Sequence, residues 1–567
     1  MQFKPAGRAE SRRCAGALVK TKSILRILFL LLPLALAFSA PGVAQDTIQL
    51  TADASAAGAP LVHFWSKVVG AGRANEGLRA TWQEELTTAV KYGGFQYVRF
   101  HGIFHNDMFL YREDEHGNPV YNFQYVDDLF DRMLATGARP FVELSFVPDE
   151  LAKVKGTTFW WKANGSPPTD YNKWADLVRH LVEHCVARYG QREVESWYFE
   201  VWNEPNLYGF FAGTQQQYFE LYKLTAETIK KIDPALRVGG PTTSNFNLDE
   251  AALKQAQASG KPFDPLDIPW KPVWVEDFLT WCQQNKLPVD FVSTHPYPQD
   301  FAIDEPGKPR GGKYRRSIDA TRDDLRLLRK MIDASAYPKA GIELTEWNSS
   351  PSPTDHSHDS LAAAAFIAKT NLESIGNVDS LSYWVFTDVF EENRLTDSIF
   401  HGGFGLINYQ QIVKPAFHAY RFMNQLGDTT LAQTVGALVS RDSKSGKVSA
   451  VAYNYPKEMR VSLPLTDTIA DADKIDSTGS PREFNLTLTH LASNAAFEIE
   501  TLDRAHGDAV AAWEQMGSPE PPTREQTELL RKLAWATNKE IVRADASGRL
   551  EIKATLPAWA VVLVREL

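Results

Sequence analysis

Apolar and polar positions follow two alternating periods over residues 66–426. Short apolar runs of strand length are each followed by a segment with apolar residues three or four positions apart, as in an amphipathic helix. The predicted strands are Ser66–Gly70, Tyr97–His101, Pro140–Phe146, Trp197–Trp202, Arg237–Gly240, Asp290–His295, Gly341–Trp347 and Ser380–Asp388. The predicted helices are Leu78–Tyr92, Tyr125–Thr136, Tyr171–Tyr189, Thr214–Lys231, Pro272–Asn285, Ile318–Ile332, Ser360–Ser374 and Ala416–Gln425. Eight strand–helix pairs in sequence predict a (β/α)8 TIM barrel over residues 66–426.

The pattern changes after Leu426, where predicted strands follow one another. They are Ala432–Ser440, Val448–Tyr453, Arg460–Pro464, Glu483–His490, Leu550–Thr555 and Ala558–Arg565. This spacing predicts a C-terminal β-sandwich domain over residues 427–567, with a helical insert at Pro522–Ala534. Residues 45–65 contain one more alternating segment, Thr47–Ala52. The barrel does not need this strand, so we expect it to join the β-sandwich.

Residues 1–44 have the features of a signal peptide. They carry seven Lys and Arg and an apolar run, Ile27–Ala37, which is too short to span a bilayer comfortably. Small residues at Gly42 and Ala44 fit cleavage after Ala44, and Ala40 offers a competing site. We expect an exported, soluble protein in the periplasm or outside the cell, with no membrane contact after cleavage.

The balance of charge disfavours some partners. The whole chain has a formal net charge of −10; its first 44 residues hold seven basic residues and one acid, so the remainder carries −16. Such an acidic chain is a poor partner for nucleic acid. Cys185 and Cys282 lie in predicted helices, which favours buried free thiols, and no Cys/His group has the spacing of a zinc site. We therefore expect neither a metal nor a cofactor.

An aromatic run, Trp197–Trp202, leads directly into Asn203-Glu204-Pro205. A strand covered on both faces has this composition, and Pro205 ends it because proline has no N–H to donate. Asn203 and Glu204 then stand at the carboxyl end of the fourth strand, which is the active face of a β/α barrel. An apolar wall raises the pKa of a carboxyl group and keeps its proton on, as a general acid requires. The alternative is a structural carboxylate that pairs with an arginine.

A second carboxylate, Glu346, stands at the end of the seventh predicted strand. Strands four and seven lie across a barrel from each other, so both glutamates can reach one bond. Hydrolysis of a glycosidic bond uses such a pair: one carboxylic acid protonates the leaving oxygen, and one carboxylate attacks the anomeric carbon or directs water to it. Glu343 precedes Glu346 by three residues, nearer the bottom of the barrel and on the other face of the strand, so we interpret it as structural.

Several longer motifs carry a resemblance to a known family. They are His63–Arg73, Tyr97–Gly102, Trp197–Leu207, Val289–His295, Thr345–Ser350, Ser382–Glu392 and Phe400–Leu406. In this order they resemble glycoside hydrolase family 39, which contains β-xylosidases and α-L-iduronidases. The last two motifs are more similar to the bacterial β-xylosidase branch. The resemblance covers the barrel and not the C-terminal domain.

The resemblance implies that Glu204 is the acid/base, Glu346 the nucleophile, and Asn203 the residue that holds the sugar 2-hydroxyl. It places the other members of the sugar site at His101, His295, Tyr297, Trp384, Glu391 and Glu392. The chain departs from some xylosidases where Pro-Tyr-Pro follows His295 in place of a run of small residues. This departure leaves the exact sugar open.

Most of these residues also have a structural interpretation. His101 could be a core histidine at a strand end. His101 and His105 could belong to a metal site, although they do not lie on a helix and no third carboxylate is spaced with them. Trp384 could simply line the barrel, and Glu391 and Glu392 could form a solvated pair on a loop.

The activity predicted best is a retaining β-xylosidase that acts on the non-reducing ends of xylo-oligosaccharides. A uronic acid needs a cation to pair with its carboxylate, whereas Glu391 and Glu392 suit neutral hydroxyls. Arg394 is the nearest cation that follows them. Other family activities stay open: α-L-iduronidase-like, arabinosidase, or endo-acting exopolysaccharide hydrolase. A metal-dependent hydrolase and a non-catalytic carbohydrate-binding protein also stay open, although the latter would usually lack one of the two glutamates.

Overall fold

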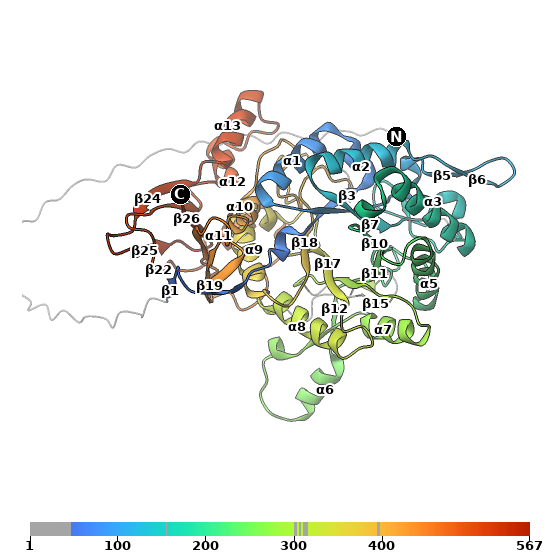
Figure 1. Ribbon diagram of the computed structural model, residues 1–567, viewed down its shortest axis with the longest axis horizontal. Helices are drawn as coiled ribbons and strands as arrows, with labels where there is room; N and C mark the ends of the chain where they lie inside the picture. The colour runs from blue at the N-terminus through green and yellow to red at the C-terminus, as the bar shows by residue number, and fades with distance from the viewer. Residues whose placement is uncertain (1–46, 155, 300–302, 306–307, 310–315, 394–396) are drawn as a thin grey trace, which may run out of the picture. The chain divides into compact units, whose positions relative to one another are not determined.

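A computed structural model describes residues 47–567, apart from 155, 300–302, 306–307, 310–315 and 394–396. The signal peptide predicted over residues 1–44 and the cation Arg394 therefore lie outside the described residues. The core of the chain is a closed barrel of eight parallel strands, with helices around it (Figure 1). The predicted (β/α)8 fold is confirmed.

The barrel strands run in chain order around the barrel, with each pair of neighbours parallel. They are β3 (Val68–Arg73), β4 (Tyr97–His101), β7 (Arg139–Leu144), β10 (Tyr198–Val201), β11 (Arg237–Ser244), β14 (Phe291–His295), β17 (Gly341–Trp347) and β18 (Ser380–Tyr383). The helices that follow them are α1 (Ala80–Gly93), α2 (Gln124–Thr136), α3 (Tyr171–Tyr189), α5 (Gln215–Ile232), α7 (Val275–Gln284), α8 (Ala320–Asp333), α9 (Leu361–Glu373) and α10 (Pro415–Met423). Shorter helices in the barrel domain are α4 (Gln191–Val194) and α6 (Glu250–Ala258).

Local sequence signals set the ends of these helices. Thr214 and Gln217 form a capping box at the start of α5, with each side chain accepting the other residue's backbone N–H. Asp170 accepts from two backbone N–H groups at the start of α3. Gly94 and Gly137 end α1 and α2 in the left-handed conformation, which glycine adopts without a steric penalty.

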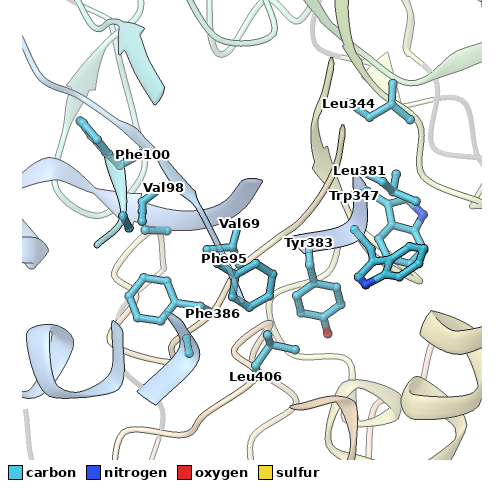
Figure 2. Close-up of a cluster of buried hydrophobic side chains, with 14 of the residues drawn as sticks. Val69, Phe95, Val98, Phe100, Leu344, Trp347, Leu381, Tyr383, Phe386 and Leu406 are labelled. Carbon is cyan, nitrogen blue, oxygen red and sulfur yellow. The ribbon is translucent and has the colours of Figure 1, made fainter. Parts of the chain in front are cut away.

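Side chains on each barrel strand alternate between the helices and the barrel interior. On β4, Val98 and Phe100 belong to the large apolar cluster outside the strands (Figure 2). Tyr97, Arg99 and His101 face inward. Tyr97 packs in an aromatic layer at the bottom of the barrel, Arg99 lies in a charged layer above it, and His101 lies at the top. The interior therefore becomes more polar toward the carboxyl ends of the strands.

Two further sheets contain the C-terminal strands. The first has the order β1–β22–β25, and the second has the order β2–β19–β20–β21–β26–β23–β24. Their strands are β1 (Thr47–Asp53), β2 (Ala59–Pro60), β19 (Thr429–Thr434), β20 (Ala437–Arg441), β21 (Val448–Tyr453), β22 (Arg482–Thr489), β23 (Ala496–Leu502), β24 (Asn538–Arg543), β25 (Leu550–Leu556) and β26 (Val561–Glu566). One apolar cluster joins the inner faces of both sheets, with Ile48, Phe484 and Val564 among its members. β1 pairs with β22 in parallel.

The C-terminal domain also differs from the prediction. Arg460–Pro464 is not a strand; only Val461 makes an isolated bridge. The predicted strand Ala432–Ser440 is a hairpin, because Gly436 takes a positive φ of 100° that no extended strand can contain. The sequence interpretation missed β23 and β24. The predicted helical insert is α13 (Arg524–Ala534), and α11 (Ile469–Asp476) and α12 (Ala509–Gln515) were not predicted.

Polar contacts connect the barrel helices to the C-terminal strands. The Arg421 guanidinium donates to both carboxylate oxygens of Glu500, the closer at 2.7 Å, and the Tyr453 hydroxyl donates to Glu373 at 2.8 Å. These bonds are partly buried, where a charged hydrogen bond is stronger than at a fully exposed surface. Within the described part of the chain, no helix combines the length and apolar character needed to cross a membrane.

Candidate active site

A strained turn places Glu204 at the mouth of the barrel. β10 ends at Val201, and both Trp202 and Glu204 then take positive φ values, 74° and 45°. The turn is held by the Glu204 N–H, which donates to Thr242 O at 2.8 Å, and by the Trp202 indole N–H, which donates to Phe210 O at 3.1 Å. Non-glycine residues in this region cost about 1–3 kcal/mol each, and such strain concentrates at functional sites.

An irregularity in β17 places Glu346. The register between β17 and β18 shifts between Leu344 and Trp347, so the simple alternation of faces is lost there. Thr345 and Glu346 both contact residues of the barrel interior. Glu343 is not on the outer face as predicted. It forms an ion pair with Lys67 at 2.5 Å, beside the aromatic layer at the bottom of the barrel.

The two glutamates meet over one cavity. One carboxylate oxygen of Glu204, one of Glu346 and a ring nitrogen of His295 all lie within 4.8 Å of one another. The cavity has a volume of about 320 Å³, at the low end of the range for ligand pockets. Its lining consists of His101, Asn203, Glu204, Leu207, Phe210, Tyr297, Glu346, Pro351, Trp384, Glu392 and Phe404.

Arg99 does not line this cavity but contacts two residues that do, Glu346 and Asn203. Its guanidinium, fully buried, lies 2.7 Å from both Glu143 and Glu200 and 3.2 Å from Glu346. It also donates to Asn203 Oδ1 at 2.9 Å, which leaves the Asn203 NH₂ as the group that can donate to a ligand. Burial alone would lower the pKa of Arg99, but the three carboxylates outweigh it and raise the pKa. The sequence analysis did not single out Arg99, although a charged residue in the middle of a buried strand indicates a buried ion pair.

The two glutamates differ in their surroundings. Burial raises the pKa of Glu204 to about 7. Burial also raises the pKa of Glu346, while Arg99 opposes the rise. Glu346 accepts from the Tyr297 hydroxyl at 2.6 Å and from Arg99 Nη1 at 3.2 Å. Two donors favour the carboxylate form of Glu346, so Glu204 is better suited than Glu346 to carry a proton.

His101 is a charged partner on the opposite wall. Its Nδ1 lies 2.7 Å from Glu143 and its Nε2 lies 3.3 Å from Glu392. Burial alone would lower the pKa of His101, but these carboxylates raise it to about 10. The Trp384 ring lies 4.7 Å from the His101 ring. Gly70 makes room for Trp384, since a Cβ there would lie 2.5 Å from a Trp384 ring carbon.

Two predicted site residues do not line the cavity: His295, which contacts Glu204 at 2.9 Å, and Glu391, which turns away from it. The Glu391 carboxylate pairs with Arg73 and Arg79, each at 2.7 Å. Burial alone would raise the pKa of Glu391, but the two arginines lower it. Adjacent loop residues point in opposite directions, so Glu392 faces the cavity and Glu391 holds the loop against η2 (Ala74–Leu78). The residues Leu207, Phe210, Pro351 and Phe404 line the cavity without having been predicted.

Glu204, His295 and Glu346 are the one trio of potential ligands among the described residues that is close enough to hold a metal ion. A cation at that point would lie beside the Arg99 guanidinium and would compete with the donors already bound to Glu346. His105 does not join His101 in a ligand set, because its Nδ1 pairs with Asp107 at 2.7 Å. The donor set therefore fits a carboxylic acid and a carboxylate better than a metal centre.

A larger cavity of about 620 Å³ lies near Trp270 and Arg316. Its buried carboxylate, Asp324, is occupied by an ion pair with Arg316. Its lining also includes Asp267, Asp319 and Asp323, of which Asp319 pairs with Lys369 and Asp323 with Arg322. The chemistry therefore assigns the active site to the smaller cavity at the carboxyl ends of the strands.

Comparisons with known proteins agree with this geometry. The family model "Glycosyl hydrolases family 39" matches residues 48–551. A β-xylosidase of Geobacillus stearothermophilus is 36% identical over 475 residues, which covers 82% of this chain and 85% of that protein. The crystal structure of a monomeric β-xylosidase from Caulobacter crescentus CB15 has a TM-score of 0.77 at 32% identity, covering 92% of this chain and 99% of that one. An α-L-iduronidase of Mus musculus is 22% identical, covering 94% of this chain and 82% of that protein. The chain belongs to glycosyl hydrolase family 39.

Proposed function

We propose that the protein is an exo-acting β-xylosidase that releases xylose from non-reducing ends by double displacement. The observation that carries the proposal is the carboxyl pair, with one oxygen of each group within 4.8 Å of the other. In retaining glycosidases the two carboxyl groups are about 5–5.5 Å apart, and in inverting enzymes about 6.5–9.5 Å. The closer spacing leaves no room for a water between nucleophile and sugar.

The roles of the two glutamates follow from their hydrogen bonds. Glu346, held as a carboxylate by Arg99 and Tyr297, attacks the anomeric carbon as the glycosidic C–O bond breaks. Glu204 gives its proton to the leaving oxygen. Glu204 then takes a proton from water, and the resulting hydroxide displaces Glu346 from the anomeric carbon. Both steps invert the anomeric centre, so the product keeps the configuration of the substrate.

The charges in the cavity support a neutral sugar. Glu204, Glu346 and Glu392 line it, and no Lys or Arg is among its described lining residues. The one cationic side chain that lines it, His101, has both ring nitrogens paired with carboxylates. A uronate would therefore bury a carboxylate beside three acidic groups, and an unpaired buried charge costs several kcal/mol. Two named β-xylosidases among the relatives support a pentose.

We also propose export, with the signal peptide removed before residue 45. The support is the basic leader and the apolar run Ile27–Ala37. The intact mass of the protein from its native host tests this proposal. A chain that starts at Gln45, or at Pro41 for the competing site, fits it, and a chain that keeps the leader contradicts it.

Glu346→Gln should lower kcat by about 10⁴-fold or more on every substrate, because no covalent intermediate can form. Glu343→Gln is the matched control on the same strand and should keep turnover. Glu204→Ala should lower kcat/KM by about 10²–10⁴-fold on xylobiose but little on a dinitrophenyl xyloside, whose leaving group needs no proton. Azide should restore part of the Glu204→Ala activity and yield β-xylosyl azide. A dead Glu343→Gln beside an active Glu346→Gln would show that the nucleophile is misassigned.

The substrate is tested with nitrophenyl β-D-xyloside, β-D-glucoside, α-L-arabinoside and α-L-iduronide under identical conditions. The xyloside should give the highest kcat/KM because the cavity is small and its charges disfavour a uronate. A preference for the iduronide would refute the charge argument. A preference for the glucoside would keep the mechanism but show that the cavity accepts a hydroxymethyl group.

A further inference from the structure

A chain of buried hydrogen bonds leads from the middle of the barrel to Glu204. Arg99 Nε donates to Glu200 Oε2 at 2.7 Å. The Thr345 hydroxyl donates to the other oxygen of Glu200, also at 2.7 Å. His295 Nε2 lies 3.1 Å from the Thr345 oxygen, and His295 Nδ1 lies 2.9 Å from Glu204 Oε1. Thr345 and His295 are fully buried, so no water competes for these positions.

The direction of each bond can be assigned from this sequence of partners. Glu200 forms an ion pair with Arg99, and a carboxylate has no hydrogen to donate. The Thr345 hydroxyl hydrogen therefore points to Glu200, and its oxygen is free only to accept. The hydrogen between Thr345 and His295 must then come from His295 Nε2. A neutral imidazole carries one N–H, so His295 Nδ1 is left without a hydrogen.

We propose that Thr345 and Glu200 are positioning residues that hold His295 in the Nε2–H tautomer, so that its bare Nδ1 accepts from a protonated Glu204. The inference rests on the proposed function, because it concerns how the acid is loaded in the free enzyme. A bare Nδ1 cannot donate to an ionised Glu204, and it gains a hydrogen bond only when Glu204 carries the proton. When substrate binds, rotation of the Glu204 carboxyl about its soft terminal torsion presents the proton to the leaving oxygen.

Other features of the site agree with this arrangement. Burial lowers the pKa of His295 to about 4, so the ring is neutral when Glu204 is protonated. His295 Nδ1 is 3.6 Å from Glu346, which is too long for a hydrogen bond, so Glu204 is its partner. The chain of hydrogen bonds from Glu200 to Glu204 does not include Glu346, which accepts instead from Arg99 and Tyr297. One histidine can therefore favour the acid form of Glu204 without protonating the nucleophile.

Charged and titratable groups surround Glu204 and His295 from every neighbouring element. They are Arg99 and His101 on β4, Glu143 on β7, Glu200 on β10, Tyr297 after β14, Glu346 on β17 and Glu392 after β18. Substitution of any of these would change the local charge as well as the tautomer. Thr345 is uncharged, so its replacement can change the tautomer without changing the local charge.

The test is the pH profile of kcat/KM for Thr345→Val, which keeps the shape of the side chain and removes the hydroxyl. Without that acceptor, His295 can take the Nδ1–H tautomer and donate to the Glu204 carboxylate, which lowers the pKa of Glu204. The acid form of Glu204 is then lost at lower pH. The alkaline limb of the kcat/KM profile on xylobiose should therefore move to lower pH by roughly one unit, which corresponds to the free energy of about one hydrogen bond. At pH values above that limb, kcat/KM of the variant on xylobiose should be about tenfold lower than that of the wild type. The kcat/KM of the variant on a dinitrophenyl xyloside should be little affected. Thr345→Ser keeps the hydroxyl and should keep the wild-type limb.

An alkaline limb that stays in place or moves up in Thr345→Val would overturn the inference. So would an equal loss on both substrates at every pH, which is the result of a merely structural role. If Thr345→Val does not fold, as judged by its melting temperature, Thr345→Ala is read in the same way. Failure of the proposed function is seen separately, because the wild-type protein would then hydrolyse none of the xylosides.

Discussion

The ion-pair network of Arg99 is the interaction on which the site depends. One buried guanidinium, on β4, contacts carboxylates from β7, β10 and β17 and the amide of Asn203. Separately, each of those carboxylates would be costly to bury, and removal of one partner from a buried ion pair typically costs about 3–5 kcal/mol. Together they fix the distances among four strands at the height where the chemistry occurs. Arg99 thus links the stability of the upper barrel to the geometry of the Glu204–Glu346 pair.

The same network is the physical basis for the different roles that we propose for two similar glutamates. Both are buried, and burial raises the pKa of each. Glu346 faces two hydrogen-bond donors, whereas Glu204 faces His295 Nδ1, which has no hydrogen to give in the tautomer that we infer. A strained turn after β10 and a register shift in β17 bring them to this position, so backbone irregularity is concentrated where the chemistry needs it.

The sequence allowed the barrel to be predicted, and the positions of Glu204 and Glu346 at the carboxyl ends of their strands, because both depend on local signals. The strands Tyr97–His101 and Gly341–Trp347 have the predicted bounds, since their apolar runs end abruptly in polar residues. Glu391 was different: two adjacent glutamates on a loop look alike in sequence, and only the tertiary position of Arg73 and Arg79 separates them. Arg99 and Thr345 were missed because their roles depend on partners from other strands. The face of Glu343 was mistaken because a register shift cannot be read from alternation alone.

The central claim is a double displacement at a carboxyl pair with close spacing. The most direct test follows nitrophenyl β-xyloside hydrolysis by proton NMR during the first minutes, before the product mutarotates. The account predicts β-xylose as the first anomer formed, with α-xylose appearing later at the rate of spontaneous mutarotation. If α-xylose appears first, a single displacement by water operates and the account is contradicted.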